Sequence, residues 1–297
     1  MFINFCDLFH VKHRAFLFAP YTNCVIMFFE TNIWMKGGNS MGKVRVIAIT
    51  NQKGGVGKTT TAINLSACLA AAGKKVLTID ADQQGNTTSG LGLDKNNVAL
   101  TIYDILLEQT TFAQVKQPTC VEGLEVVPAN ISLTGAEIEL IGKEDRECIL
   151  KNALDTIKND YDFVIIDCPP SLNLITINAL TASDTVLVPI QCEYFALEGL
   201  EQLLHAVNLV RKRLNRSLEI EGIVFTMYDA RTNLSLQVVE EVKRSLGENV
   251  YRTIIPRNVR LGESPSHGLP IHLYDPKSKG AESYALLAEE VMEKEWS

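Results

Sequence analysis

The chain has 297 residues, and its 28 lysines and arginines against 35 aspartates and glutamates give a formal net charge of −7. Overall charge therefore does not draw it to nucleic acid or to an anionic membrane, and such binding would need a local basic patch. Its seven cysteines form no C-x-x-C pair, which favours a reduced, cytoplasmic setting and argues against a cysteine-held metal or iron–sulfur site.

Residues 1–40 differ in composition from the rest, because they hold seven of the eleven phenylalanines and show no clear period. Their apolar part is interrupted by Pro20 and is too short to span a bilayer, and no A-x-A-like signal-peptidase site follows it. Met41 stands directly before the first apolar strand, and residues 36–38 can be encoded by a purine run that resembles a ribosome-binding site. We predict that 1–40 is an extension, from a mis-assigned start or disordered, and that the domain spans 41–297.

From residue 41 onward the chain alternates apolar strands with helices. This pattern predicts one α/β domain, with a mostly parallel sheet covered by helices on both faces. The predicted strands are 44–49, 75–79, 124–127, 163–166, 185–189, 220–226 and 250–255, and the predicted helices are 58–72, 145–158, 197–214, 234–246 and 281–294. Residues 85–97 are rich in Gly, Asn and Thr and are predicted to be a loop. On such a sheet, ligands bind at the carboxyl ends of the strands.

The segment between the first strand and the first helix has the pattern of a phosphate-binding loop. Its glycines let the backbone fold tightly around a phosphate, and the N-terminus of the next helix adds positive potential. Lys58 is expected to reach the outer phosphates and Thr59 to ligate Mg²⁺. The general pattern has glycine where this chain has Gln52, and Lys53 adds a second positive charge. The predicted nucleotide-binding residues are Lys53, Gly54, Gly55, Val56, Gly57, Lys58, Thr59 and Thr60.

Two strand ends bring carboxylates toward this loop. Asp167 follows a buried strand, as does the Walker B acid that holds Mg²⁺, usually through water; the alternative is a turn residue before the two prolines that follow. Asp80 and Asp82 follow the second strand. One of them could orient or deprotonate an attacking water while the other organises the loop, and an Asx-turn pair is the structural alternative.

Six motifs together resemble the ParA partition ATPases, and in particular their short chromosomal, Soj-like branch. They are KGGVGKTT (53–60), DADQQGN (80–86), IIDCPPS (165–171), QCEY (191–194), DARTN (229–233) and IPRNVR (255–260). The likeness extends from residue 41 to the C-terminus. It implies a deviant-Walker P-loop ATPase in which ATP and Mg²⁺ drive formation of a nucleotide-sandwich homodimer.

The resemblance also implies roles for single residues. Lys53 matches the signature lysine that crosses to the phosphates of the partner chain, as an arginine finger does. Asp82 matches the aspartate on which hydrolysis depends, although Gln83 stands here where the family has proline, which leaves the loop less rigid. Pro256 and Asn258 match contacts on the adenine side of the nucleotide.

For DNA, Arg231 and Arg260 match arginines that bind the duplex without sequence preference in the dimer. From the residues alone, the basic clusters at 211–216 and 252–260 are typical of solvated surface. Affinity depends steeply on the number of phosphate contacts, so pairing two patches in a dimer would make DNA binding ATP-dependent. The resemblance further implies a nucleoid-associated protein that is released when a ParB-type partner stimulates slow hydrolysis.

Two alternatives to partitioning stay open at this stage. One is a nucleotide switch that regulates a replication initiator or another protein partner. The other is a MinD-like positioning ATPase, which needs a basic amphipathic helix at its C-terminus. Residues 281–297 carry five glutamates against one lysine, which is unsuited to an anionic membrane, so no membrane partner is predicted.

Overall fold

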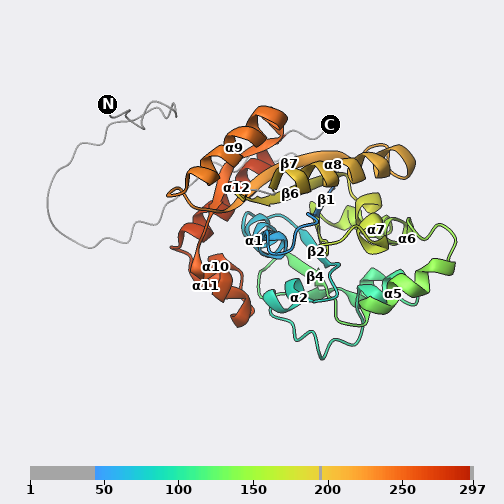
Figure 1. Cartoon of the computed structure of the whole chain (residues 1–297). Coiled ribbons are helices and arrows are strands. Elements are labelled where there is room, and N and C mark those ends of the chain that lie inside the picture. Colours follow the sequence, from blue (N-terminus) through green and yellow to red (C-terminus); the bar gives the residue numbers. More distant parts are fainter. Residues whose placement is uncertain (1–43, 194–195, 295–297) are drawn as a thin grey trace, which may run out of the picture. The chain divides into compact units, whose positions relative to one another are not determined.

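The computed structural model describes residues 44–193 and 196–294, which belong to one compact unit. The prediction for residues 1–40 lies outside the described residues. Within them, the strands form a single sheet in the order β3-β4-β2-β5-β1-β6-β7-β8 (Figure 1). Neighbouring strands in this sheet pair in parallel, with β3 against β4 as the antiparallel exception. The predicted mostly parallel α/β sheet is confirmed.

All the predicted strands are present, with ends within two residues of those expected. The strands are β1 (Arg45–Ile49), β2 (Val76–Asp80), β3 (Gln117–Pro118), β4 (Leu124–Val127), β5 (Phe163–Asp167), β6 (Thr185–Gln191), β7 (Glu219–Tyr228) and β8 (Val250–Pro256). The helices are α1 (Lys58–Ala71), α2 (Asn86–Gly90), α3 (Ile102–Leu106), α4 (Phe112–Val115), α5 (Leu133–Glu139), α6 (Ile149–Leu154), α7 (Leu174–Ala182), α8 (Ala196–Arg213), α9 (Asn233–Leu246), α10 (Val259–Glu263), α11 (Ile271–Tyr274) and α12 (Lys279–Glu293). A search of the described residues finds no helix long and apolar enough to cross a bilayer.

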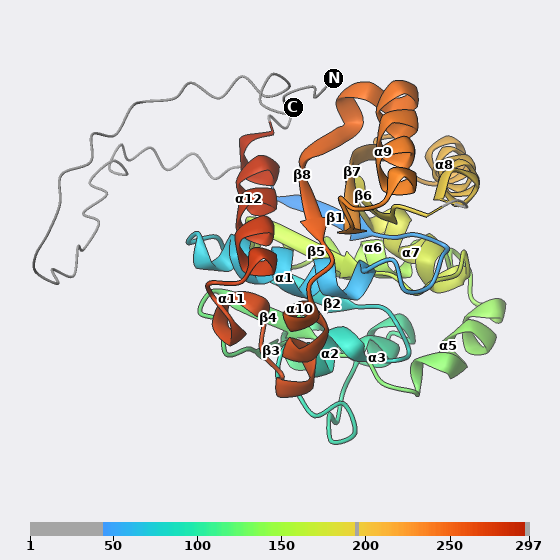
Figure 2. The same ribbon diagram turned by 60° about the vertical axis from the view of Figure 1, so that its left-hand side comes forward.

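Both faces of the sheet are buried, and alternate residues of each strand serve them. In β1, Val46 and Ala48 join one apolar cluster, while Ile47 and Ile49 join the other. This is the period of two that a strand imposes on its side chains. Helices α1 and α12 cover the Ile47 face, and α6, α7, α8 and α9 lie on the opposite face (Figure 2).

Two local predictions are only partly right. Residues 91–97 form turns and loop as expected, but residues 86–90 form α2. The carboxylate of Asp80 accepts hydrogen bonds from the backbone N–H and the hydroxyl of Thr88, at 2.8 and 2.7 Å, and holds the first turn of this helix. The helix expected at 145–158 is reduced to α6. Asp145 has φ 49°, a left-handed conformation that an α-helix does not accept, so the helix begins only at Ile149.

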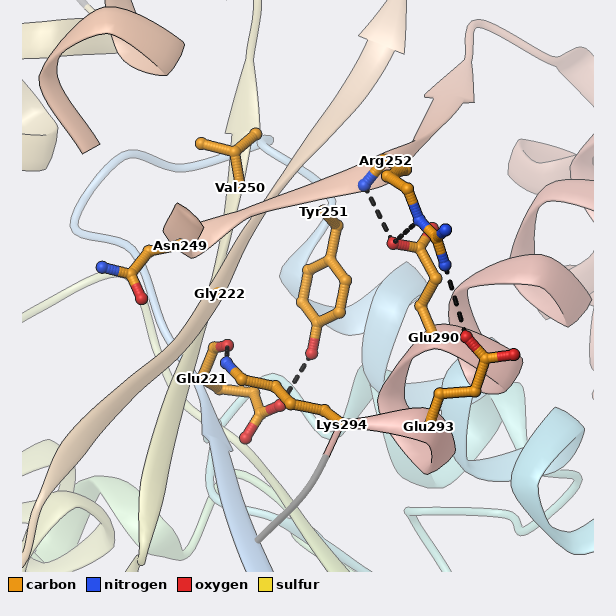
Figure 3. Close-up of a pocket in the computed structure, with 9 residues that line it drawn as sticks. All are labelled: Glu221, Gly222, Asn249, Val250, Tyr251, Arg252, Glu290, Glu293 and Lys294. Atoms are coloured by element: carbon orange, nitrogen blue, oxygen red, sulfur yellow. Dashed lines mark hydrogen bonds and ion pairs between the residues drawn. The ribbon is translucent and has the colours of Figure 1, made fainter. Parts of the chain in front are cut away.

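A buried ion pair lies at the end of the sheet opposite the phosphate loop. Figure 3 shows its carboxylate, Glu221, with the hydroxyl of Tyr251 bonded to it. Arg45 on β1 is 4% exposed and pairs with Glu221 on β7, which is 1% exposed. Glu221 also accepts hydrogen bonds from Tyr251 and Thr185, both at 2.7 Å. Arg45 donates to the carbonyl of Val291 at 2.7 Å, which ties α12 to the sheet. These bonds offset the cost of taking two charges out of water.

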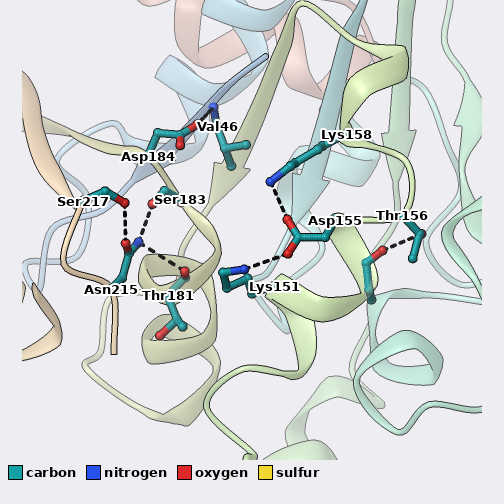
Figure 4. A network of polar contacts seen from close by, with 11 residues as sticks. Val46, Lys151, Asp155, Thr156, Lys158, Thr181, Ser183, Asp184, Asn215 and Ser217 are labelled. Atoms are coloured by element: carbon teal, nitrogen blue, oxygen red, sulfur yellow. Dashed lines mark hydrogen bonds and ion pairs between the residues drawn. The ribbon is translucent and has the colours of Figure 1, made fainter. Parts of the chain in front are cut away.

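A second polar network joins the chain segments that lead into β6 and β7 (Figure 4). Asn215 follows α8. Its side-chain amide donates to the carbonyl of Leu180 in α7 at 3.2 Å and to the carbonyl of Ser183, just after α7, at 2.6 Å. The carboxylate of Asp184 accepts the N–H of Val46 at 2.8 Å. The amino-terminal ends of the strands are thereby held by structural contacts, and the carboxyl ends are left for chemistry.

We expect Glu221→Ala to lower the free energy of unfolding by about 3–5 kcal/mol, because it removes the buried carboxylate that pairs with Arg45 and accepts hydrogen bonds from Tyr251 and Thr185. Urea denaturation at neutral pH measures this. Glu219→Ala, on an exposed position of the same strand, is the control and should change stability by less than about 0.5 kcal/mol. Equal stabilities of the two variants would contradict a stabilising role for the buried Arg45–Glu221 pair.

Candidate functional site

The phosphate loop follows β1 and leads directly into α1. Gly55 has φ 75° and Gly57 has φ 89°, a backbone conformation that other residues adopt only with strain. A Cβ atom on Gly54 or Gly55 would meet nothing within 4 Å, so the loop faces open space at these two positions. The loop therefore leaves room for a ligand in front of the N-terminus of α1.

Lys58 is buried at the base of this loop, where its ammonium donates to the carbonyl of Lys53 at 3.1 Å. Burial lowers the pKa of Lys58, and the negative charges of Asp167 and Asp82 oppose that shift. The structure thus brings Lys58 into the field of two carboxylates that the sequence had placed at the ends of other strands.

Those strand ends meet because β2 and β5 are neighbours and Asp80 lies directly beside Asp167 in their register. Both carboxyl groups are fully buried. Burial, with repulsion from Asp80, raises the pKa of Asp167 to about 7, and burial raises that of Asp80 to about 6.

The surroundings of Asp167 fit a magnesium ion. Its Oδ1 atom is buried and has no hydrogen-bond partner among the described residues. The Thr59 side chain lies close enough to this carboxyl group to oppose the rise of its pKa. A hydroxyl and a carboxylate oxygen are hard ligands of the kind Mg²⁺ prefers, with waters in its remaining positions. The two predicted metal ligands therefore lie together.

The structure separates the two aspartates that follow β2. Asp80 organises the loop, since its carboxylate accepts from the N–H of Asp82 at 3.2 Å as well as from Thr88. Asp82 is half-buried, and its carboxylate accepts the N–H of Gln84 at 2.9 Å, which is the Asx turn named above as the structural alternative. Only Asp80 belongs to the strand, because β2 ends there and Asp82 lies in the turn that follows. Asp82 as the water-orienting residue stays a prediction.

A cavity of about 320 Å³ lies beside the phosphate loop. Gly57 and Thr60 line it on one side, and Pro256 and Asn258, after β8, line it on the other. Its volume is in the range of small-molecule sites. Both residues predicted to contact the adenine thus line a cavity beside the loop, and their contact with a base stays a prediction.

Two residues of β7 at this cavity were missed by the sequence analysis. The hydroxyl of Thr226 donates to the carbonyl of Val56 at 2.8 Å and so braces the phosphate loop from a neighbouring strand. Met227 lines the cavity with φ 49°, a strained conformation of the kind that gathers at ligand sites. A threonine and a methionine in an apolar strand carry no signal beyond that of the strand itself.

Lys53 is held by its own chain at the edge of the loop. Its ammonium pairs with Glu193, just beyond β6, and both side chains are partly exposed. Its backbone N–H donates to Asn51 Oδ1 at 3.0 Å, and the amide of Asn51 donates to the carbonyl of Pro189 at 2.8 Å. Glu193 belongs to the QCEY motif, to which the sequence analysis assigned no role.

Arg231 follows β7 and Arg260 follows β8, so both lie at the carboxyl end of the parallel strands, as the phosphate loop does. Their side chains are 86% and 55% exposed. The basic cluster at 211–216 lies at the amino-terminal end of the strands, because α8 runs back from the carboxyl end of β6 to the start of β7. Each of the two arginines is paired within the chain. Arg231 pairs with Asp229, whose pKa it holds well below the usual range, and Arg260 pairs with Glu263 at 2.8 Å and Asp275 at 3.5 Å.

Comparison with known proteins agrees with this geometry. Residues 44–220 match a family model described as an AAA domain. Over 251 residues, which are 84% of this chain and 98% of the relative, the chain is 61% identical to the sporulation initiation inhibitor protein Soj of Bacillus subtilis. The chain belongs to the ParA/Soj family of chromosome-partitioning ATPases. The ParA protein of Myxococcus xanthus is 54% identical to it, over 84% of this chain and 89% of that protein. The resemblance inferred from the six motifs is confirmed.

A solved structure extends the comparison from sequence to fold. The cobyrinic acid a,c-diamide synthase of Mycobacterium smegmatis, with bound ADP and magnesium, superimposes with a TM-score of 0.74 and is 38% identical. The match covers 84% of this chain and 94% of the synthase. The ParA/Soj chain thus shares the P-loop NTPase fold with a protein that binds a nucleotide and magnesium.

The buried carboxylates make the nucleotide-free protein sensitive to pH. The pKa of Asp167 is raised in the folded state, so the native protein binds this proton more readily than the unfolded chain between about pH 4 and pH 7. Stability is therefore lost as the pH rises through that window. We expect Asp167→Asn to raise the free energy of unfolding at pH 8 by roughly 1–3 kcal/mol, with a smaller gain at pH 5. Urea titrations without Mg²⁺ at both pH values test this, and a loss of stability at pH 8 would contradict it.

Proposed function

We propose that this chain partitions chromosomal or plasmid DNA by an ATP-driven cycle. ATP with Mg²⁺ closes two chains into a sandwich dimer, the dimer binds DNA without sequence preference, and slow hydrolysis stimulated by a ParB-type partner releases it. The protein then acts in the cytoplasm on the nucleoid. The observation that carries the proposal is the convergence of Lys58, Thr59 and Asp167 at a phosphate loop beside a nucleoside-sized cavity, with Lys53 at its rim.

In the nucleotide site each residue has a distinct task. Lys58 and the backbone N–H groups of the loop bind the outer phosphates, and Thr59 with Asp167 holds the metal. Mg²⁺ held there would supply positive charge that offsets the negative charge developing on the phosphate oxygens. Asp82, at the turn after β2, orients the attacking water. Pro256 and Asn258 contact the base from the far side of the cavity.

Lys53 completes the site of the partner chain. Lys58 already occupies the base of its own loop, whereas Lys53 lies at the edge and is 35% exposed. On closure Lys53 exchanges Glu193 of its own chain for the phosphates across the interface. The exchange is inexpensive, because an exposed ion pair contributes about 1 kcal/mol or less.

DNA binding is supported by the position of the two arginines and by the charge of the chain. Asn258 lines the base cavity, and its side-chain oxygen accepts the N–H of Arg260 at 2.8 Å as the N-cap of α10. A segment that contacts the nucleotide thereby also carries a DNA-binding residue. With a net charge of −7, one chain offers few phosphate contacts, and a dimer doubles them.

A regulatory output through protein partners, such as a replication initiator, is a second candidate. It is favoured by the name of the Bacillus subtilis relative, which refers to inhibition of sporulation initiation. We do not propose a MinD-like membrane role. The apolar residues of α12, among them Tyr284, Leu287 and Val291, are buried in the core that α12 shares with α1, so this face of the helix is already used.

The cycle is tested by ATP turnover and dimerisation of three variants. Lys53→Ala should lose both ATP-dependent dimerisation and stimulated turnover. Asp82→Ala should keep dimerising but lose about a hundredfold in turnover, because the attacking water is no longer oriented. Glu193→Gln frees Lys53 and should dimerise at up to about fivefold lower ATP concentration. Lys212→Ala, on the far edge, is the control. A Lys53→Ala protein that dimerises like wild type would refute the role of this lysine.

Co-sedimentation with DNA in ATP, ADP or no nucleotide separates partitioning from a purely protein-directed switch. Wild type should pellet with ATP alone, and Arg231→Glu and Arg260→Glu should each lose at least about tenfold in affinity. Arg213→Glu, an equal charge reversal at the opposite edge, should retain binding. If Arg231→Glu and Arg260→Glu pelleted with DNA as wild type does, the two arginines would not be the DNA-binding residues. If wild type did not pellet with DNA in ATP, the protein-directed switch would be favoured.

A further inference from the structure

We propose that Thr87, a residue of α2 that none of the motif assignments uses, is a positioning residue for the magnesium site. Its hydroxyl orients the carboxylate of Asp167 so that one oxygen stays available to the metal, and it ties the loop of Asp82 to that carboxylate. The inference rests on the proposed function of the phosphate loop as a site for ATP with Mg²⁺.

The first observation is the way in which the two oxygens of Asp167 are used. Thr87 is fully buried and its Oγ1 atom donates to Asp167 Oδ2 at 2.7 Å. The other oxygen, Oδ1, is buried as well and has no hydrogen-bond partner among the described residues. A short hydrogen bond to a carboxylate is directional and strong, so it sets the rotation of the group. Thr87 thereby occupies one oxygen and leaves the second as the metal ligand.

The second observation concerns the loop between β2 and α2. At its start, the N–H of Asp82 donates to Asp80 at 3.2 Å. At its end, Thr88 is bonded to Asp80, and its neighbour Thr87 is bonded to Asp167. The segment that carries Asp82 is therefore attached at both ends to the carboxylates of two adjacent strands.

A third contact limits how far this attachment can relax. Gly85 begins α2 with φ 59°, and a Cβ atom there would lie 2.6 Å from the carbonyl oxygen of Ala129. The same residue, Ala129, donates its N–H to the hydroxyl of Thr88 at 2.9 Å. Because α2 is confined in this way, a change in the orientation of Asp167 on binding the metal is transmitted through Thr87 to the loop, rather than absorbed by free movement of the helix.

Groups that orient a metal ligand typically change metal affinity by 10- to 100-fold when they are removed. Thr87→Val keeps the shape of the side chain and removes the donor. We therefore expect the Mg²⁺ concentration for half-maximal binding of a fluorescent, non-hydrolysable ATP analogue to rise about tenfold. Thr87→Ser keeps the hydroxyl and should stay within about threefold of wild type.

A matched control is available on β2. Thr78 is also fully buried, and its hydroxyl has no hydrogen-bond partner within the part of the chain that the structure describes. Thr78→Val makes the same chemical change close to the site and should leave the Mg²⁺ dependence unaltered. Thermal unfolding of each variant shows whether it is folded, and Thr87→Ala replaces Thr87→Val in the titration if the valine variant is not.

The outcomes are distinguishable. If Thr87→Val showed the Mg²⁺ dependence of wild type, the hydrogen bond would be irrelevant and the positioning role would be overturned. If Thr87→Ser lost as much Mg²⁺ affinity as Thr87→Val, the shape of the side chain rather than its hydroxyl would be decisive, which would also overturn it. An equal shift in Thr78→Val would also overturn it. If the wild-type chain itself binds the analogue with no dependence on Mg²⁺, the proposed function of the site fails instead.

Discussion

Two carboxylates lie buried side by side at the ends of β2 and β5, and the cost of desolvating them is the constraint on which the site depends. Isolated buried charges are expensive, so each must find donors, a cation or a proton. Asp80 is satisfied by backbone and hydroxyl donors, and this arrangement shapes the loop that holds Asp82. Asp167 keeps one oxygen without a partner within the described residues. The desolvation that raises the pKa of Asp167 would also favour a cation bound beside this oxygen.

A second constraint is the shortage of positive charge. The chain is acidic overall, and both arginines assigned to DNA are paired with carboxylates of their own chain, as Lys53 is paired with Glu193. Each cation proposed to act on another molecule is held by a partly exposed acid, and such pairs exchange at little cost. Binding that depends on many weak contacts then requires two copies of the surface. The proposed ATP-dependent dimerisation and DNA binding would both depend on this distribution of charge.

The strands were predictable because strands buried on both faces are continuous apolar runs. The long helices were predictable from their period, and the motifs located the phosphate loop and Asp167. The short helices could not be predicted, since segments such as α10 are too brief to show a period and depend on a single cap, here Asn258. Likewise the loop prediction at 85–97 missed α2 at residues 86–90, because this short helix is stabilised by the carboxylate of Asp80, which lies outside it at the end of β2.

By itself the sequence determined the chemistry of each local segment: a glycine loop before a helix, an acid after an apolar strand, and a second lysine at Lys53. These are properties of residues close together in the chain, and they would be the same whatever the order of the strands in the sheet. Only the tertiary structure decided which segments meet. Placing β2 beside β5 brings Asp80 against Asp167, and β7 lets Thr226 brace Val56 from 170 residues away. Strand order is set by the packing of two whole faces of the sheet, which no single segment encodes.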